Sequence, residues 1–576
     1  MLSRPIARVR RIAPAALPAL IIFACALSAA YSLRLTFRFY HPALFADQWE
    51  TILFFDRLLQ GTITFGDFIA QHNEHRILFP RLVFVLDLWL TGARNGVNFA
   101  AILVCQAVHL ALFHRMIALR VAEVWIRWAL TALVAALLFG IVQWENFLWG
   151  FQIQFVGVFL FFTIAAFAFA TAQERTAGEP RWHLVATGFC FGAGAALMMS
   201  NGAAALACIA LVFAAARRFN RLTLAIALAA ALLLVLYAAT FTPNPGHTPL
   251  GFAARNPLLF VGYVAAYLGG MFAPLGFRPA LLAGLIGLAA SGLAGLALFT
   301  GRLARDRVNL TLVAILLFAG MTAAMTGMGR SSFGIAQALA SRYATPSAIF
   351  WAALIVLAVS WLRAREPRQM QQTWPALVLL GAGALVSLMA IGLAQREFRF
   401  AGNLRVFDLQ RANDALLSGV NDVPRIRTLY PDMNLVNNVM LPVLKARRLN
   451  VFAVPEPWPL DTLVPESRLV NDPVRCFGHI DGIAAVADTG AFEVSGWAWD
   501  AGARQPFRRL VVLSQERRVV GYGSSGQGRA DVVARVPGVT SFFVGWAAYA
   551  RVPGALTVAG QRLDGTLCRI GTIPSP

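Results

Sequence analysis

The chain has 576 residues, of which 58% are hydrophobic and only 13% charged, and its mean hydropathy is positive. These values exclude an ordinary soluble globular protein, in which about 25% of residues are charged. The net charge of +21 would indicate nucleic-acid binding in a soluble chain, but many arginines lie in short clusters beside apolar runs, which is the positive-inside pattern of membrane proteins.

Residues 1–395 are predicted to form a polytopic α-helical membrane domain. Their Ala/Leu/Val-rich runs approach the ~20 residues that a helix needs to cross ~30 Å of hydrocarbon. The basic N-terminus resembles a signal peptide, but its apolar stretch is long and lacks a small-residue cleavage site, so residues 12–33 are predicted to be an uncleaved helix. Following the charge clusters along the chain predicts about 11 spans plus two partial segments, 77–92 and 257–276.

The arginine clusters also predict the orientation of this bundle. Four arginines within residues 4–11 place the N-terminus in the cytoplasm, because basic residues are retained on that side. Residues 34–76 then form a large first extracytoplasmic loop, and the region after the last span is extracytoplasmic. We expect a multi-pass protein of a bacterial inner (cytoplasmic) membrane with a periplasmic C-terminal region.

The C-terminal region is predicted to have two parts. Residues 396–475 suit a small α/β module or connector, with an apolar strand in the segment NVFAV. From about residue 476 short alternating strands separated by Gly, Pro and Asp turns fit a β-sandwich-like domain. Cys476 and Cys568 stand at its two ends, and in an oxidising compartment we expect a disulfide between them. The aromatic residues of GWAWD are expected mainly in the domain core, with a carbohydrate platform as the alternative.

Four stretches on the predicted extracytoplasmic side carry polar groups that packing does not require. The first follows the first helix, the second is QWENFLWGFQIQ, the third is the turn Ser200-Asn201-Gly202, and the fourth is GMGRSSFGIAQALASRYATPS. The candidate catalytic residues are Asp47 and Glu50, and the candidate substrate-binding residues are His72, Glu74, His75, Gln143, Glu145, Asn146, Asn201, Arg330, Arg342 and Tyr343.

Each stretch also has a purely structural interpretation. The Trp residues fit an interfacial aromatic belt, the external arginines fit lipid anchors, and Ser-Asn-Gly fits a turn between short helices. The segment His-Asn-Glu-His lacks the spacing of a helical zinc motif, and no third ligand is evident, so no metal site is predicted there. Taken together, the acids, arginines and aromatics favour binding of a charged lipid and a polyhydroxyl compound.

The arrangement resembles the GT-C superfamily of polyprenyl-phosphate-sugar-dependent integral-membrane glycosyltransferases. The resemblance covers residues 12–394 and rests on the first outer loop with its early acid in ADQWE, the half-segment HRILFPRL, and the paired short helices around SNG. It implies that Asp47 is the catalytic base, with Glu50 in reserve, and that a polyprenyl-phosphate sugar and a cell-surface glycan or glycolipid are the substrates. Asp47 and Glu50 are separated by Gln48-Trp49, unlike the paired acids of the oligosaccharyltransferase branch, so a divalent cation stays an open question.

Two other functions compete with sugar transfer. A polysaccharide polymerase or ligase also has many spans and external arginines, although its large loop usually lies between late helices. A transporter of lipid-linked glycans would place ionisable residues mid-membrane and contain internal repeats. Apart from Asp87, the spans contain few ionisable residues, and no repeat is evident.

Overall fold

The computed structural model describes residues 3–174, 181–242, 246, 249, 251–365 and 374–574 of the chain. They belong to two compact units, neither of which is a single stretch of chain. The membrane unit contains Met1–Arg38, Thr64–Val83 and Asn98–Glu397, and the C-terminal unit contains Phe39–Ile63, Phe84–Val97 and Phe398–Pro576. The division at residues 395 and 475 that composition suggests stays a prediction.

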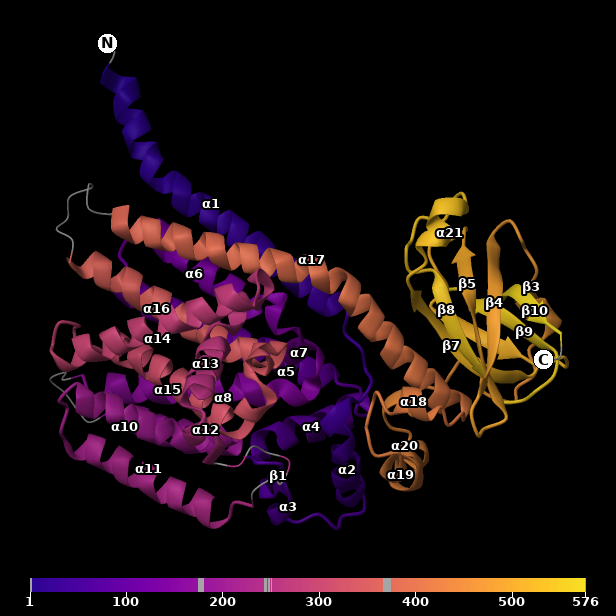
Figure 1. Ribbon diagram of the computed structural model, residues 1–576, viewed down its shortest axis with the longest axis horizontal. Helices are drawn as coiled ribbons and strands as arrows, with labels where there is room; N and C mark the ends of the chain where they lie inside the picture. Colours follow the sequence, from indigo (N-terminus) through magenta and orange to yellow (C-terminus); the bar gives the residue numbers. More distant parts are fainter. Residues whose placement is uncertain are drawn as a thin grey trace. The chain divides into compact units, whose positions relative to one another are not determined.

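The membrane unit consists mainly of helices (Figure 1). Within the described residues, nine helices are long and apolar enough to cross a membrane, so the chain is a membrane-embedded protein. The bounds of its helices are α1 Ser3–Arg38, α3 Phe65–Ile69, α5 Gly96–Arg120, α6 Val124–Phe139, α7 Trp144–Leu148, α8 Ile153–Ala172, α9 Trp182–Gly194, α10 Ala205–Ala215, α11 Arg221–Ala239, α12 Gly251–Arg255, α13 Pro257–Leu268, α14 Phe277–Phe299, α15 Arg307–Arg330, α16 Ala344–Arg365 and α17 Trp374–Ser418.

Burial separates inner from outer helices of this unit. Helices α6, α8, α15 and α16 are mostly buried inside it, whereas α11 and α14 expose large apolar side chains such as Leu232 and Leu293. Such a surface suits hydrocarbon rather than water. Figure 1 shows α1 beside α17, where the Gln395 side chain donates hydrogen bonds to the hydroxyl of Ser32 (2.9 Å) and the carbonyl of Ser28 (2.8 Å).

Several apolar helices are shorter than the bilayer core. The predicted spans 183–199 and 202–216 correspond to short helical stretches, Trp182–Leu197 and Ser200–Ala215. Helix α13 has 12 residues and gives way to a 3-10 segment, Gly270–Leu275. At 1.5 Å per residue it is about 18 Å long, and the partial insertion of 257–276 stays a prediction. Helix α4, Leu78–Thr91, has 14 residues and is likewise short.

The first elements of the C-terminal unit along the chain are helices. Its 3-10 segment Ala46–Glu50 leads into α2, Thr51–Leu59, and the helices after α17 are α18 Val423–Ile426, α19 Met433–Leu435 and α20 Leu441–Ala446. The strand predicted for NVFAV was wrong, because Asn450–Phe452 form a 3-10 turn. Asn450 has a positive φ of 54°, and its side chain donates to the carbonyls of Pro42 and Ala93 (both 2.7 Å), so loop contacts decide its conformation.

The remainder of this unit is a single eight-stranded sheet in the order β3-β10-β9-β6-β7-β8-β5-β4. A two-layer sandwich was therefore the wrong architecture for this domain. Register shifts in several strand pairs, including β4–β5 and β10–β9, increase the local twist and allow one sheet to curl into a half-barrel. The strands are β3 Leu469–Val470, β4 Cys476–Val486, β5 Ala491–Asp500, β6 Arg509–Leu513, β7 Val519–Gln527, β8 Gly545–Ala550, β9 Leu556–Gln561 and β10 Leu567–Ile573, with helix α21 at Ala530–Arg535.

Strands β4 and β10 approach one another without pairing by hydrogen bonds. A Cβ added to Gly478 of β4 would lie 2.9 Å from the side chain of Ile570 on β10. The predicted disulfide between Cys476 and Cys568 is confirmed and joins these two strands. Of the two aromatic residues of GWAWD, Trp499 is buried, as expected, whereas Trp497 is only half-buried. Trp546 and Tyr549 of β8 are buried as well.

Candidate functional site

A tight hairpin in the membrane unit presents the acid of the HNEH segment. Strands β1, Gln71–His72, and β2, His75–Arg76, are joined by a two-residue turn in which Asn73 has a φ of 49°. Asn tolerates this left-handed conformation better than most residues. The turn places Glu74 at the tip, where its Oε1 lies 3.8 Å from Nη2 of Arg330 and 3.6 Å from Nε2 of His75.

The Ser-Asn-Gly turn provides the next contact of His75. Its Nδ1 lies 2.8 Å from the hydroxyl of Ser200, at the start of the 3-10 segment Ser200–Ala204. Asn201 instead donates to the hydroxyl of Thr322 on α15 at 2.9 Å, and its side chain is buried. A Cβ on Gly202 would lie 1.9 Å from the carbonyl oxygen of Ala195, so this close approach requires glycine. The predicted turn is therefore present, and it also places the Ser200 hydroxyl beside His75.

The second predicted arginine has a carboxylate partner of its own. Glu145 Oε1 lies 3.3 Å from Nη1 of Arg342, and Glu145 Oε2 accepts hydrogen bonds from the Ser341 hydroxyl (2.6 Å) and the Arg342 amide (3.0 Å). Asn146 donates to the carbonyl of Arg342 at 2.8 Å and to the hydroxyl of Thr345 at 2.7 Å. The QWEN segment thus holds the start of α16 in place, although nearly 200 residues separate the two segments.

Gln143 and Asn146 have buried side chains inside this polar cluster. Gln143 accepts from the hydroxyl of Thr345 and from the amide of Gln106 on α5 (3.2 Å). Both side chains therefore help to hold the start of α16 in place, and Gln143 also connects it to α5. A direct role in substrate binding stays a prediction for them, whereas Glu145 and Arg342 retain partial exposure.

Tyrosines complete the surroundings of the arginines. The guanidinium of Arg342 lies 5.1 Å from the ring centroid of Tyr343, and the hydroxyl of Tyr343 accepts a hydrogen bond from Gln337 at 3.4 Å. The Gln337 carbonyl in turn accepts from the Tyr263 hydroxyl. Gly327 lies three residues before Arg330 on α15, and a Cβ added there would be 3.3 Å from the Tyr263 ring, so Tyr263 packs near the segments that carry both arginines.

Tyr263 and Tyr267 lie outside the four polar stretches that the sequence singled out, and Ser200 and Gln337 lie within those stretches but were not among the candidate site residues. The rings of Tyr267 and Tyr343 have centroids 4.9 Å apart. Tyr263 and Tyr267 are four residues apart on α13 and therefore share one helix face. Two tyrosines at this spacing in a short apolar helix were the available signal. His72 makes a different contact, because its ring lies 5.0 Å from that of Phe151.

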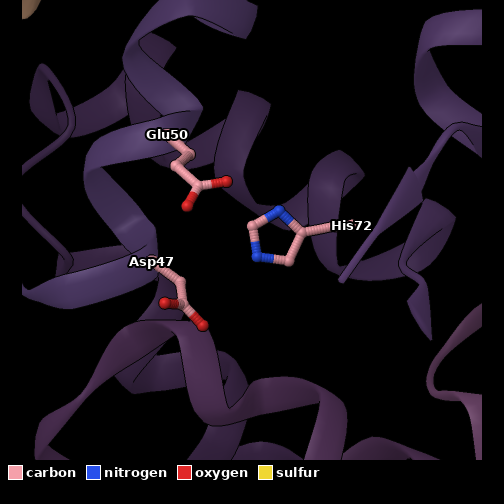
Figure 2. A group of neighbouring side chains, drawn as sticks. All are labelled: Asp47, Glu50 and His72. Carbon is pink, nitrogen blue, oxygen red and sulfur yellow. The ribbon is translucent and has the colours of Figure 1, made fainter. Parts of the chain in front are cut away.

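The predicted catalytic acids belong to the C-terminal unit. Asp47 and Glu50 lie three residues apart in the 3-10 segment Ala46–Glu50, with carboxylate oxygens within 4.8 Å of each other. Figure 2 shows both side chains extending from that segment, and it also draws His72 of the membrane unit. The intervening Gln48 and Trp49 are buried. The Asp-x-x-Glu spacing thus directs two carboxylates outward while the residues between them anchor the segment.

The anchors of this segment are specific. The Trp49 indole donates to the carbonyl of Leu44 at 3.1 Å, and its ring stacks on Tyr430, whose hydroxyl donates to Glu50 at 3.3 Å. Burial and the nearby acids, Glu50 foremost, raise the pKa of Tyr430 to about 12, which keeps this hydroxyl a hydrogen-bond donor. Two adjacent carboxylates offer the oxygen ligands that Mg²⁺ and Ca²⁺ prefer, so these two acids of the C-terminal unit could hold a divalent cation.

Asp87, an ionisable residue within a predicted partial membrane segment, has a structural role. Its buried carboxylate accepts hydrogen bonds from the amides of Asn95 and Val97 (both 2.8 Å) and from the hydroxyl of Thr91 (2.9 Å). It therefore satisfies the backbone of the loop that follows α4.

Comparisons with protein-family models, with curated proteins and with solved structures found no match to the chain.

Proposed function

We propose that the chain is a membrane glycosyltransferase that transfers a sugar from a polyprenyl-phosphate donor to a cell-surface glycan or glycolipid. The observation that carries the proposal is the pair Arg330 and Arg342 of the membrane unit. Both guanidinium groups are partly exposed, and each lies beside one carboxylate. Guanidinium groups bind phosphate oxygens in a bidentate manner, and an apolar bundle suits the polyprenyl chain.

The carboxylates beside these arginines serve to orient them. An isolated arginine in an apolar environment is costly, and a carboxylate at 3.3–3.8 Å reduces that cost while holding the guanidinium in position. The hydroxyls of Ser200 and Tyr343, with the imidazole of His75, add hydrogen-bonding groups that a sugar can use. This combination fits a donor that carries both a phosphate and hydroxyl groups.

The reaction we propose is an inverting transfer. Asp47 removes the proton from an acceptor hydroxyl, whose oxygen forms a bond to the anomeric carbon of the donor sugar. The bond between that carbon and the phosphate oxygen breaks, and the lipid phosphate leaves with the electron pair. Arg330 and Arg342 stabilise the charge that develops on the phosphate, and each well-placed contact contributes on the order of 3 kcal/mol. A divalent cation on Asp47 and Glu50 would supply further positive charge.

We place this reaction on the extracytoplasmic face. The charge clusters predict that side, and the disulfide between Cys476 and Cys568 is of a kind that persists in oxidising compartments. The structural role of Asp87 weakens the transporter alternative, because it removes the mid-membrane acid on which that alternative relied.

Glycan analysis of a strain lacking the protein tests the proposal. Loss of one sugar substituent supports transfer, whereas shortened chains would indicate a polymerase and accumulated intact lipid-linked sugar would indicate an exporter. Complementation with Arg342→Gln is expected to restore the substituent poorly, because the phosphate loses a bidentate partner. Arg278→Gln is the matched control, since Arg278 is an exposed arginine at the start of α14. Full complementation by Arg342→Gln would contradict the assigned role.

A further inference from the structure

The C-terminal unit contains a polar cavity whose lining includes none of the candidate site residues. Its volume is about 520 Å³, and every residue that lines it belongs to this unit. Pockets for small molecules commonly measure about 300–1,000 Å³, so the cavity is large enough for a ligand. It lies among the last turns of α17, the loop around residue 455 and the ends of strands β5, β6 and β9.

Most carboxylates of the cavity already have cationic partners. Glu456 forms a bidentate pair with Arg509, at 2.6 and 3.2 Å, and Asp500 accepts from Arg562 at 3.4 Å. Arg509 also donates to Oδ1 of Asp414. Burial alone would lower the pKa of Arg509, but Asp414 and Glu456 outweigh burial and raise it. These charges therefore hold the wall of the cavity together.

Asp414, the third carboxylate of the wall, is buried among protein groups and does not face the open cavity. Its side chain is only 2% exposed, its Oδ1 accepts from Arg509, and the Ser524 side chain is a further hydrogen-bond partner. Asp414 therefore belongs to the wall of the cavity and leaves ligand binding to other residues.

Two arginines of the cavity have no carboxylate partner. Neither Arg94 nor Arg508 forms an ion pair with any residue that the structure describes. Arg508 is exposed, whereas Arg94 is partly buried. The cavity thus contains two cationic groups whose charge an anionic ligand can balance.

The neutral lining suits a sugar ring. Amide side chains at Gln410, Asn413 and Gln505 can donate to and accept from hydroxyls. Pro455 and Pro457 are exposed and offer apolar rings without hydrogen-bond donors, against which the C–H faces of a saccharide can pack. A ligand with hydroxyls, apolar faces and negative charge satisfies all of these groups together.

We propose that this cavity binds an acidic oligosaccharide, with its acid group on Arg94 and Arg508 and its hydroxyls on the side-chain amides of Gln410, Asn413 and Gln505. The inference is independent of sugar transfer, because it concerns binding by a separate set of residues. It assigns the C-terminal unit a role in glycan recognition that the buried aromatic residues of its sheet do not provide.

The test measures binding of trigalacturonate to the purified full-length chain in detergent by isothermal titration calorimetry. Saturable binding is expected, together with at least tenfold weaker binding of neutral maltotriose and of inorganic phosphate. Arg508→Gln should weaken trigalacturonate binding roughly tenfold, since a hydrogen bond to a charged group contributes about 1.5–3 kcal/mol. Arg569→Gln is the matched control, because Arg569 is exposed on β10 and does not line the cavity.

Arg94→Gln tests the second arginine separately. The acid group would lose one of its two cationic partners, so trigalacturonate binding should weaken to a similar extent. If this variant fails to fold, Arg508→Gln and the comparison of probes decide the matter. Equal binding of maltotriose or phosphate, no binding of trigalacturonate, or an unaltered affinity in Arg508→Gln would each overturn the proposal. None of these results depends on transfer activity, so failure here leaves the proposed function untouched.

Discussion

Removal of the disulfide between Cys476 and Cys568 should destabilise the β-sheet domain by a calculable amount. The two cysteines are 92 residues apart in sequence. Closing a loop of this size in the unfolded chain lowers its entropy enough to stabilise the folded state by about 4.6 kcal/mol at 25 °C. With a urea dependence of roughly 2 kcal/mol per molar, the unfolding midpoint should fall by about 2 M.

The assay is pulse proteolysis of the full-length chain across a urea series, with and without reductant. A C-terminal tag reports cleavage within residues 476–576. Alkylation under denaturing conditions should modify four cysteines before reduction and six after it, because Cys25, Cys105, Cys190 and Cys208 are free thiols. Cys190→Ser, which removes an exposed free thiol, is the control. An unchanged midpoint after complete reduction would refute the reasoning, because the disulfide would then not restrict the conformations of the unfolded chain.

Three further predictions concern other parts of the chain. Asp47→Asn should abolish sugar transfer at normal expression, measured in membranes, and Glu50→Gln should reduce it less; near-normal activity of the first would remove Asp47 from the site. Gly202→Ala should lower the melting temperature in detergent, because its Cβ would overlap the backbone of Ala195; an unchanged value would contradict the close approach. Burial and Arg405 lower the pKa of His41 to about 3, so the unfolded chain binds more protons below about pH 6.5. Thermal stability of the C-terminal unit should therefore fall from pH 7 to pH 5, and His41→Gln should flatten that dependence.

Local composition determined the features that depend on local physics. A helix in hydrocarbon must satisfy its own backbone and be apolar along ~20 residues, so the long helices could be predicted from hydropathy alone. The short helix α13 was recognised by its Gly269-Gly270 pair, because glycine weakens a helix wherever it occurs. The disulfide followed from two cysteines at the ends of one domain.

Contacts between distant segments required the tertiary structure. The segment Asn450–Phe452 has strand-like composition but forms a turn, because the Asn450 side chain bonds to loop carbonyls far away in sequence. The eight strands form one sheet because β6 pairs with β9 and β5 pairs with β8. The alternation of residues along each strand could not predict these pairings. Alternation specifies which residues face inward, but it does not specify which strands are neighbours.

For the candidate site too, the sequence indicated individual residues, whereas their contacts required the tertiary structure. Sequence reasoning selected Glu74, Glu145, Arg330 and Arg342 as exceptional residue types for their positions, since charged groups beside apolar helices are costly without a purpose. It could not pair Glu74 with Arg330 or Glu145 with Arg342, because helix packing alone brings those side chains together. Charge and hydropathy are properties of a segment, whereas a binding site depends on which segments meet.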